Sequence, residues 1–226
     1  MTQKIRALAI DGPAGAGKST IARAVSRELG WIYVDTGAMF RALALFLMRS
    51  AVDAGDEAAV SGAVRDAVVS LHHENGEQQI FLNGENVSAE IRTEAVGNMA
   101  SAVSVYPAVR SQLLELQRGI AASQPVVMDG RDIGTVVLPD ADTKVYLTAS
   151  VQVRALRRFK ELQGRGQHCD LTEIERDIEA RDYRDMHRET APLRRAEEAV
   201  LLDSSDMSAA EVQARILELV KSRENQ

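Results

Sequence analysis

The residues best suited to chemistry in this chain form a glycine-rich run that ends at Lys18, Ser19 and Thr20. The segment from Gly12 to Ser19 fits the pattern G-x-x-x-x-G-K-[ST], which is typical of loops that bind the phosphates of a nucleoside triphosphate. Glycines allow backbone N–H groups to converge on phosphate oxygens, while Lys18 offers a charge to the outer phosphates and Ser19 a hydroxyl to Mg²⁺. The predicted triphosphate-binding residues are Gly12, Pro13, Ala14, Gly15, Ala16, Gly17, Lys18, Ser19 and Thr20.

The sequence on either side of the loop is the context that this pattern requires. Residues 7–10 are an apolar run, which predicts a buried strand, and residues 19–29 carry apolar side chains at helical spacing up to Gly30. The helix would add its positive N-terminal end to the same anion site. A chance glycine-rich turn is the alternative, but it does not account for the strand and the helix.

The balance of charges favours a small anionic ligand over a long polyanion. The net charge of the 226 residues is −6, which argues against a general nucleic-acid surface. Arginine nevertheless makes up 22 of the 27 basic residues, and ten of these arginines lie between Arg154 and Arg195. Because arginine binds phosphate in a bidentate way, this composition fits a small phosphorylated substrate held in a cleft.

The rest of the composition predicts a soluble protein of the cytoplasm. No run approaches the ~20 apolar residues that span a membrane, and residues 2–6 lead into the first predicted strand without a signal-peptide pattern. Cys169 is the only cysteine, which excludes an intrachain disulfide and favours a reducing compartment. Cys169 and the adjacent His168 are too few for a metal site. We expect a monomer that binds small molecules, and neither nucleic acid nor a membrane.

Strands and helices alternate along most of the chain. Besides residues 7–10, buried strands are predicted at 31–34, 126–128, 144–147 and 199–202. Helices are predicted at 38–50, 56–69, 90–105, 107–122 and 209–220, the first capped by Thr36 and the last by Ser208, and a charged helical segment covers 151–188.

A small antiparallel insert interrupts this alternation. The runs 68–72 and 78–82 flank Asn75-Gly76, a dipeptide that favours a tight hairpin turn. The rest of the chain predicts an α/β fold with a parallel five-stranded sheet and helices on both faces. In such sheets ligands bind at the carboxyl ends of the strands, where this chain places Asp11, Asp35, Asp129 and Asp203.

Asp129 and the residues after it are the second candidate site. A carboxylate that closes a buried strand is a common neighbour of Mg²⁺, which it contacts directly or through water. Arg131 can face a phosphate, and Asp132 can accept a hydrogen bond from an amino group. The alternative is a strand end with a turn and a surface ion pair, which the phosphate loop elsewhere in the sheet makes less favoured.

Two further groups of basic residues have both a functional and a solvated interpretation. Arg41, just after the second predicted strand, could reach a ligand or could be an ordinary surface side chain. By their spacing, one helical face carries Arg181, Arg184, Asp185 and Arg188. An anion bound there would relieve the repulsion between Arg184 and Arg188, whereas neighbouring acidic residues could balance the same face in solvent.

These motifs together resemble the bacterial cytidylate kinase family, one of the nucleoside monophosphate kinases, nearly from end to end. The most specific matches are the string Asp-Gly-Arg-Asp-Ile-Gly-Thr at 129–135 and the repeated Arg-Asp at 181–185. Further matches are Asp11-Gly12-Pro13, Asp35-Thr36-Gly37 with Arg41, the hairpin, Ser101, Val109-Arg110, and residues 147–150, 191–193 and 202–204.

The resemblance implies a kinase fold and a reaction. It implies transfer of the γ-phosphoryl group of ATP to CMP or dCMP, with Mg²⁺ and without a covalent enzyme intermediate. It further implies one unit over residues 1–226, in which 36–105 form a monophosphate-binding region with the hairpin insert and 151–190 form a mobile lid.

The resemblance also assigns roles to individual residues. It implies catalytic roles for Lys18, Arg131, Arg188 and Asp129, with Mg²⁺ at Ser19 and Asp129. Arg41, Arg131 and Arg188 would hold the monophosphate. Ser101, Arg110 and Asp132 would read the cytosine, Arg181 and Asp185 would meet the sugar, and Thr36 is a further CMP contact. Arg157 and Arg158 would meet the donor phosphates.

One residue departs from the family pattern. Phe40 stands where the family has a tyrosine, so a hydroxyl is missing and no role is carried over to it. Asp132 and Arg110 complement cytosine, which presents an amino donor beside two acceptors. The alternatives are another small-molecule kinase of this fold, such as an adenylate or shikimate kinase, and a nucleotide-dependent switch. The chain has no Asn-Lys-x-Asp string, which weighs against a guanine-binding switch.

Overall fold

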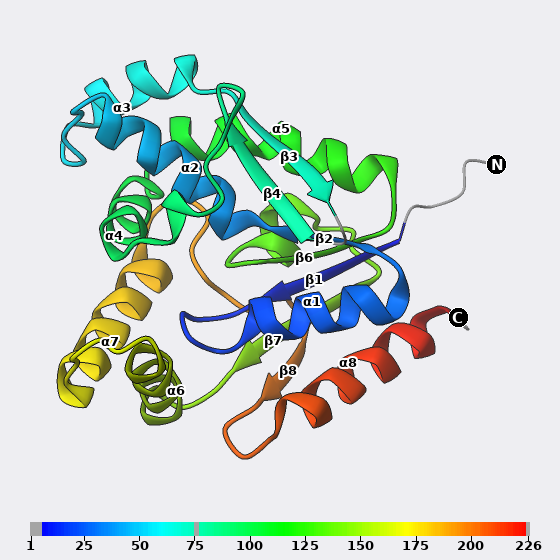
Figure 1. Ribbon diagram of the computed structural model, residues 1–226. Helices are drawn as coiled ribbons and strands as arrows, with labels where there is room; N and C mark the ends of the chain where they lie inside the picture. Colours follow the sequence, from blue (N-terminus) through cyan, green and yellow to red (C-terminus); the bar gives the residue numbers. More distant parts are fainter. Residues whose placement is uncertain (1–5, 75–76, 225–226) are drawn as a thin grey trace. The chain divides into compact units, whose positions relative to one another are not determined.

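The structure is a computed structural model that describes residues 6–74 and 77–224. These residues divide into two compact units, one formed by 32–126 and the other by 6–31 together with 127–224 (Figure 1). Within the described ranges no helix combines the length and the apolar character needed to cross a bilayer.

The expected parallel sheet is present. Five strands form it in the order β2-β6-β1-β7-β8, with bounds Ile32–Asp35, Val126–Gly130, Ala7–Asp11, Thr143–Thr148 and Val200–Asp203. β1 pairs with β7 from Leu8↔Thr143, and β7 pairs with β8 up to Thr148↔Asp203, both in parallel. All five residues of β1 are buried and the first four are apolar, as expected for a strand covered on both faces. The predicted α/β fold is confirmed.

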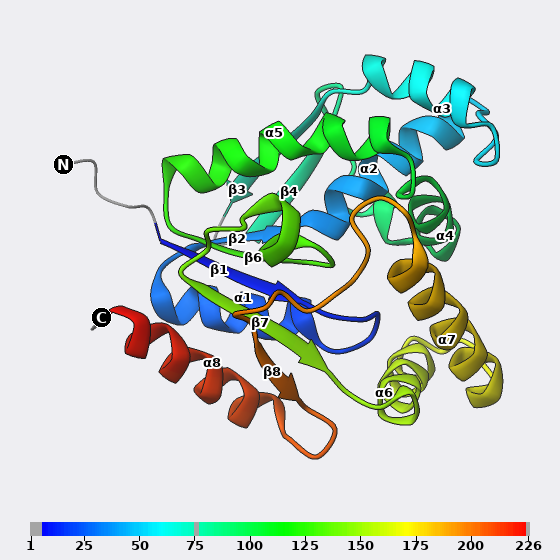
Figure 2. The same cartoon turned by 180° about the vertical axis from the view of Figure 1, so that it is seen from behind.

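The helices of the larger unit have two arrangements. α1 (Lys18–Leu29) and α8 (Ala209–Glu224) lie side by side along one face of the sheet (Figures 1 and 2). α6 (Val151–Gly164) and α7 (Leu171–His187) pack against each other beyond the end of β7. The single charged segment predicted at 151–188 is therefore a pair of helices. Ser208 caps α8 as predicted, since its Oγ accepts from the Glu211 N–H while the Glu211 carboxylate accepts from Ser208.

The smaller unit combines four helices with the hairpin insert among the residues described. The helices are α2 (Thr36–Arg49), α3 (Glu57–Ala63), α4 (Glu94–Val103) and α5 (Pro107–Ser123). The insert is a three-stranded antiparallel sheet of β3 (Val69–Glu74), β4 (Glu77–Leu82) and β5 (Glu85–Asn86). The hairpin prediction is confirmed, while its predicted turn at Asn75-Gly76 lies outside the described residues.

Three predicted helix boundaries in the smaller unit are wrong. Asp35, not Thr36, caps α2, because its Oδ1 accepts from the Ala38 N–H at 2.8 Å. The helix predicted at 56–69 ends at Ala63 and passes through a 3-10 turn before β3, whose pairing with β4 takes up residue 69. The helix predicted at 90–105 starts only at Glu94, where Thr93 supplies the cap.

Gly12 shows how closely the phosphate loop approaches the sheet, and it provides a test of the fold. Its φ is 151°, and a Cβ at this position would lie 1.9 Å from the backbone oxygen of Leu147, which cannot move aside without breaking β7. Gly12→Ala should therefore lower the free energy of unfolding by more than about 3 kcal/mol. Urea denaturation measures this change.

Gly119→Ala is the matched control, because Gly119 is exposed within α5 and a Cβ there meets no atom within 4 Å. This variant should be more stable by about 0.5–1 kcal/mol, since alanine favours helix over glycine. Similar stability for both variants would contradict the close approach of Gly12 to β7.

Candidate active site

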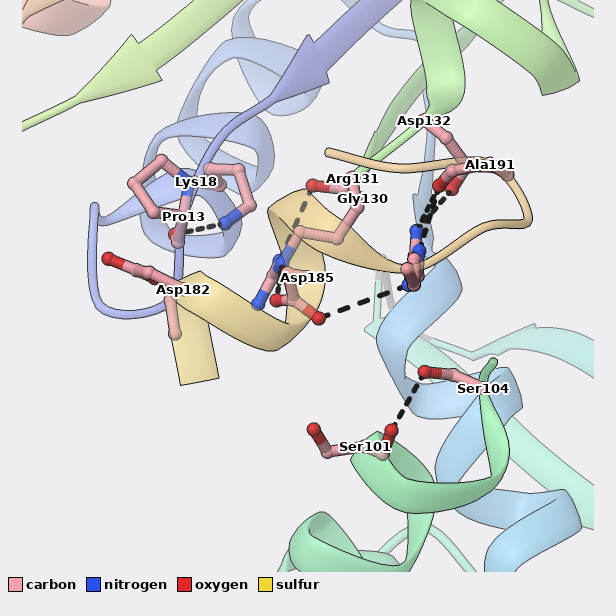
Figure 3. Close-up of polar contacts among 12 residues, drawn as sticks. Pro13, Lys18, Ser101, Ser104, Gly130, Arg131, Asp132, Asp182, Asp185 and Ala191 are labelled. Atoms are coloured by element: carbon pink, nitrogen blue, oxygen red, sulfur yellow. Dashed lines mark hydrogen bonds and ion pairs between the residues drawn. The ribbon is translucent and has the colours of Figure 1, made fainter. Parts of the chain in front are cut away.

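The phosphate loop joins β1 to α1 and curls around its own lysine. Gly15 and Gly17 have φ values of 74° and 89°, a left-handed conformation that glycine adopts without strain. Lys18 begins α1 and is buried, and its Nζ donates a hydrogen bond to the Pro13 carbonyl oxygen at 2.7 Å (Figure 3). The loop therefore holds an ammonium group at the N-terminus of a helix, where anions bind favourably.

Lys18 lies in surroundings that disfavour its own charge. Burial lowers the pKa of its ammonium well below the usual value, and the guanidinium of Arg131 lowers it further. The carboxylate of Asp129 acts in the opposite direction. A phosphate beside both cations would favour their charged forms, so the electrostatics of this group suit an anionic ligand.

Ser19 and Asp129 bring two oxygen atoms together beside the loop. The Ser19 hydroxyl donates to Asp129 Oδ2 at 2.9 Å, and Asp129 is buried near the end of β6. A hydroxyl and a carboxylate are the oxygen ligands that Mg²⁺ takes in loops of this kind, the rest coming from water and phosphates. The pair that the sequence predicts for Mg²⁺ thus fits that ion in both chemistry and spacing.

Asp11 links the end of β1 to the segment after Asp132. Its Oδ1 accepts from the Ile133 N–H at 2.8 Å and its Oδ2 from the Gly134 N–H at 2.7 Å. Burial raises the pKa of Asp11 to about 6, although these two donors act in the opposite direction. Its carboxylate binds the first two N–H groups of a π-helical turn at Ile133–Val137 and so fixes the backbone next to Asp132. No sequence pattern predicted this turn.

Arg131 and Asp185 form the centre of a buried charge cluster (Figure 3). Arg131 Nε donates to Asp185 Oδ2 at 2.8 Å. Burial alone would raise the pKa of Asp185, but Arg131 and then Arg181 and Arg188 hold it below its ordinary value. Burial would likewise lower the pKa of Arg131, yet Asp185 raises it above the usual range. The pair is thus ionised, and α7 brings its carboxylate to the residue after β6.

Arg188 reaches the same cluster from just beyond α7, which ends at His187. Its guanidinium lies 3.9 Å from Asp185 Oδ1 and 3.7 Å from Asp132 Oδ1. Nε and Nη2 donate to the carbonyl oxygen of Ala191 at 2.8 and 2.6 Å, and Ala191 has a left-handed φ of 50°. The chain beyond the helix, more than the helix itself, therefore orients Arg188.

The predicted acceptor residues Thr36, Arg41, Ser101 and Arg110 belong to the smaller unit. Arg41 Nη2 pairs with Asp35 Oδ2 at 3.1 Å, so the residue that caps α2 also orients this guanidinium. Arg110 donates to the Ser104 carbonyl oxygen at 3.1 Å, and its guanidinium carbon lies 5.3 Å from the centre of the Phe40 ring. The ring that replaces the family tyrosine therefore still packs against Arg110.

Ser101 is a candidate contact for a ligand on its own geometry. Its Oγ is buried and has no hydrogen-bond partner among the residues described, whereas the adjacent Ser104 Oγ donates to the Ser101 carbonyl oxygen at 3.0 Å (Figure 3). A buried hydroxyl without a partner costs free energy, and a polar ligand could remove that cost.

A hollow beside the phosphate loop was not predicted from the sequence. It encloses about 240 Å³, and its lining is Ala16, Gly17, Thr20, Ile21, Arg157, Ser204, Met207, Ala209 and Val212. Arg157 is held at its edge, where it donates to Ser204 Oγ at 3.2 Å and to the Ser204 carbonyl oxygen at 2.7 Å. The predicted triphosphate residues Ala16, Gly17, Thr20 and Arg157 are thus brought together, with apolar lining from α1, from Met207 and from the start of α8.

Other predicted residues lie apart from this arrangement. Arg158, expected near the donor phosphates, pairs with Glu161 at 3.0 Å on the exposed side of α6. Of the four residues predicted on one helical face, Asp185 and Arg188 are buried, Arg181 is half-buried and Arg184 is exposed. The spacing of the arginines did not indicate which of them is buried.

A phosphate loop after the first strand of a parallel sheet, with Ser19 and Asp129 beside it, defines an α/β protein of the P-loop kinase class. The family model described as cytidylate kinase matches residues 8–222. Cytidylate kinases from Lactobacillus johnsonii and Geobacillus thermodenitrificans are 47% and 46% identical to the chain over 217 and 216 residues, which cover 96% of it and 94% and 96% of those proteins. The chain belongs to the cytidylate kinase family and is a kinase.

A solved structure supports the fold alone. An uncharacterised protein from Eubacterium ventriosum has a TM-score of 0.55 to this chain at 10% identity, covering 97% of this chain and 99% of the other. At that identity the likeness carries no argument about substrate.

The Arg131–Asp185–Arg188 cluster makes a prediction for stability. Asp185→Asn should lower the free energy of unfolding by about 3 kcal/mol near pH 7, because buried guanidinium groups lose their carboxylate. The pKa of Asp185 in the folded protein lies below its ordinary 3.8, so this stabilisation is complete above that value and is lost as the pH falls through the folded-state pKa. Urea unfolding at pH 7 and at about pH 2, well below the ordinary value, measures the difference between variant and wild type.

Asp177→Asn is the control, since Asp177 is exposed on the same helix. It should change the free energy of unfolding by less than about 0.5 kcal/mol at either pH. If the deficit of the Asp185 variant were the same at both pH values, the ionised pair would not be what stabilises the cluster.

Proposed function

We propose that this kinase transfers the γ-phosphoryl group of ATP to CMP or dCMP and yields ADP with CDP or dCDP. The observation that carries the proposal is a phosphate loop with a buried Lys18 and the Ser19–Asp129 pair, beside Arg131, which is held at 2.8 Å by Asp185 and lowers the pKa of Lys18. Arg188 is buried in the same cluster as Arg131. Membership of the cytidylate kinase family supports the choice of acceptor.

The residues of the larger unit suggest how transfer proceeds. Lys18 would exchange its bond to the Pro13 carbonyl oxygen for one to the donor phosphates, while Arg131 and Arg188 meet the acceptor phosphate. In-line transfer between two phosphates needs positioning and charge stabilisation, and no side chain need act as a nucleophile. Ser19 and Asp129 would hold Mg²⁺, which when bound neutralises charge on the phosphates.

The acceptor contacts are proposed from membership of the family. In the smaller unit we propose Arg41 for the phosphate, Ser101 and Arg110 for the base, and Thr36 as a further contact. In the larger unit Asp132 would accept from the cytosine amino group, and Arg181 and Asp185 would meet the sugar. Two observations support this assignment. The Ser101 hydroxyl has no partner among the residues described, and Asp185 Oδ1 lies 3.9 Å from the Arg188 guanidinium, so both oxygen atoms can accept a further hydrogen bond.

The donor is assigned to the phosphate loop and to the hollow beside it. The hollow borders the loop at Ala16 and Gly17, and its apolar lining suits the flat face of a nucleobase. We propose that Arg157, at the edge of the hollow, meets the donor phosphates, and that Arg158 joins it there after a movement of α6. We further propose that the protein is a monomer of the cytoplasm and that its partners are small nucleotides.

The function is tested by ADP release from ATP and Mg²⁺ in the presence of CMP, dCMP, UMP, AMP, GMP or shikimate. CMP and dCMP should stimulate release far above the background hydrolysis. Adenylate kinase or shikimate kinase activity would show as preference for AMP or shikimate, and a switch as hydrolysis that needs no acceptor. Lys18→Ala should lower kcat by about a hundredfold or more, because the ammonium meets charge that develops during transfer.

Asp132 makes a prediction for base specificity. Its carboxylate is buried and would repel the carbonyl that uracil carries in place of the cytosine amino group. Asp132→Asn should reduce kcat/KM for CMP strongly and for UMP less, so that the CMP/UMP ratio falls about ten- to a hundredfold. Steady-state kinetics with both monophosphates measure the ratio. An equal loss for both would indicate that Asp132 only supports Arg188.

The segment 151–190 is proposed as a lid, and 36–105 as the monophosphate-binding region. α6 and α7 are rich in exposed charge and bury few apolar side chains, which is typical of elements that open at low cost. Hydrogen exchange in 155–178 should slow by about tenfold when ADP and CMP are bound together. Exchange that does not respond to the nucleotides would show that this segment is not a lid.

A further inference from the structure

Arg154 is a buried arginine to which the sequence assigned no role. It lies in the first turn of α6 with 4% of its surface exposed. Its Nε donates to the Ala149 carbonyl oxygen at 2.8 Å, and its Nη1 donates to the Ala14 carbonyl oxygen at 3.0 Å. Nη1 also pairs with Asp182 Oδ2 of α7 at 2.6 Å. One guanidinium group thus joins the end of β7, the phosphate loop and α7.

The contact with Ala14 determines the direction of a loop N–H group. In a planar trans peptide the C=O and the following N–H point in opposite directions. Because the Ala14 carbonyl faces Arg154, the N–H of Gly15 must point away from Arg154. The two also pack tightly, since a Cβ on Gly15 would lie 3.3 Å from Arg154 Cβ. The peptide between Ala14 and Gly15 therefore has little freedom to turn.

Asp182 forms an ion pair with Arg154. Its Oδ2 makes the 2.6 Å ion pair, while its Oδ1 is buried and has no hydrogen-bond partner among the residues described. A buried carboxylate with a hydrogen-bond partner at only one oxygen costs free energy, so this pair stabilises the fold poorly. Because Asp182 neutralises Arg154, this pair offers little net positive charge to a phosphate. Arg154 can contribute more by orienting the backbone of the phosphate loop.

We propose that Arg154 is a positioning residue for phosphoryl transfer. By holding the Ala14 carbonyl it keeps the Gly15 N–H directed at a phosphate oxygen of the donor, and Asp182 holds the guanidinium in place from α7. The proposal rests on the proposed function only in taking ATP as the donor. It adds that the loop and α7 are coupled through one side chain.

Arg154→Lys is the variant that tests this. Lysine keeps the charge beside Asp182 but lacks the planar fork, so it cannot serve Ala149, Ala14 and Asp182 together. We expect the Kd for MgADP, measured by calorimetry without acceptor, to rise about tenfold, and kcat to fall by a similar factor. The KM for CMP should stay within about twofold of wild type. Arg215→Lys, at an exposed pair with Glu218, is the matched control and should change none of these values.

A double-mutant cycle with Asp182→Asn separates positioning from the other roles. If Asp182 acts through Arg154, the double variant should bind MgADP no more weakly than the weaker single variant. Additive losses would overturn the proposal, because each residue would then act independently. A lower melting temperature with an unchanged Kd for MgADP in either variant would also overturn it, since Arg154 would then be merely structural. MgADP binding needs no acceptor, so these results stand apart from any failure of CMP to stimulate turnover.

Discussion

The larger unit depends on keeping buried positive charge compensated while the charge remains available to a phosphate. Lys18, Arg131 and Arg188 lie near one another and are all buried or nearly so, an arrangement that repulsion and desolvation both oppose. Asp129, Asp132 and Asp185 supply the opposing charge from a strand end, the turn after it and a helix. Each carboxylate is close enough to stabilise a cation, yet among the residues described the lysine itself donates only to a backbone carbonyl, which a ligand can replace.

That compensation needs exact placement of the turn after β6, and Asp11 provides it. Its two backbone hydrogen bonds fix the start of the π-helical turn, and the same residue ends the strand that leads into the phosphate loop. The backbones of the two predicted sites are thus held by a single buried carboxylate. Coupling through a rigid backbone of this kind keeps residues more than a hundred positions apart at fixed places beside each other.

The sequence predicted the sheet, the loop and most helices because each has a strong local signal. Buried strands read as short apolar runs, and Gly12 to Ser19 is a motif with a mechanical reason at nearly every position. The helix ends at Ala63 and Thr93 were missed because the hairpin and a side-chain cap decided them over local propensity. Boundary errors of this kind are expected where tertiary contacts compete.

The site was predicted less completely, for a different reason. Lys18, Ser19 and Asp129 lie in strong motifs, but the hollow beside Arg157 comes from residues spread over four segments, and no spacing predicts it. The pair Arg154–Asp182 could not be predicted from the sequence either, because both residues lie on helices with many other charged side chains. Which arginine of many is buried depends on packing, and composition alone cannot distinguish Arg154 from its exposed neighbours.

The placement of Arg188 just after α7 has a mechanical consequence. The Arg188 guanidinium is held by the Ala191 carbonyl oxygen. The backbone of Asp185 is held by a hydrogen bond that the Leu193 N–H donates to its carbonyl oxygen. Both contacts lie at the C-terminal end of the helix. The helix of 17 residues is thus a rod of roughly 25 Å that is held at its C-terminal end. A tilt of about 10° would sweep the far end by roughly 4 Å while the charged groups at the pivot barely move, so one element can serve both as a fixed electrostatic wall and as a moving arm.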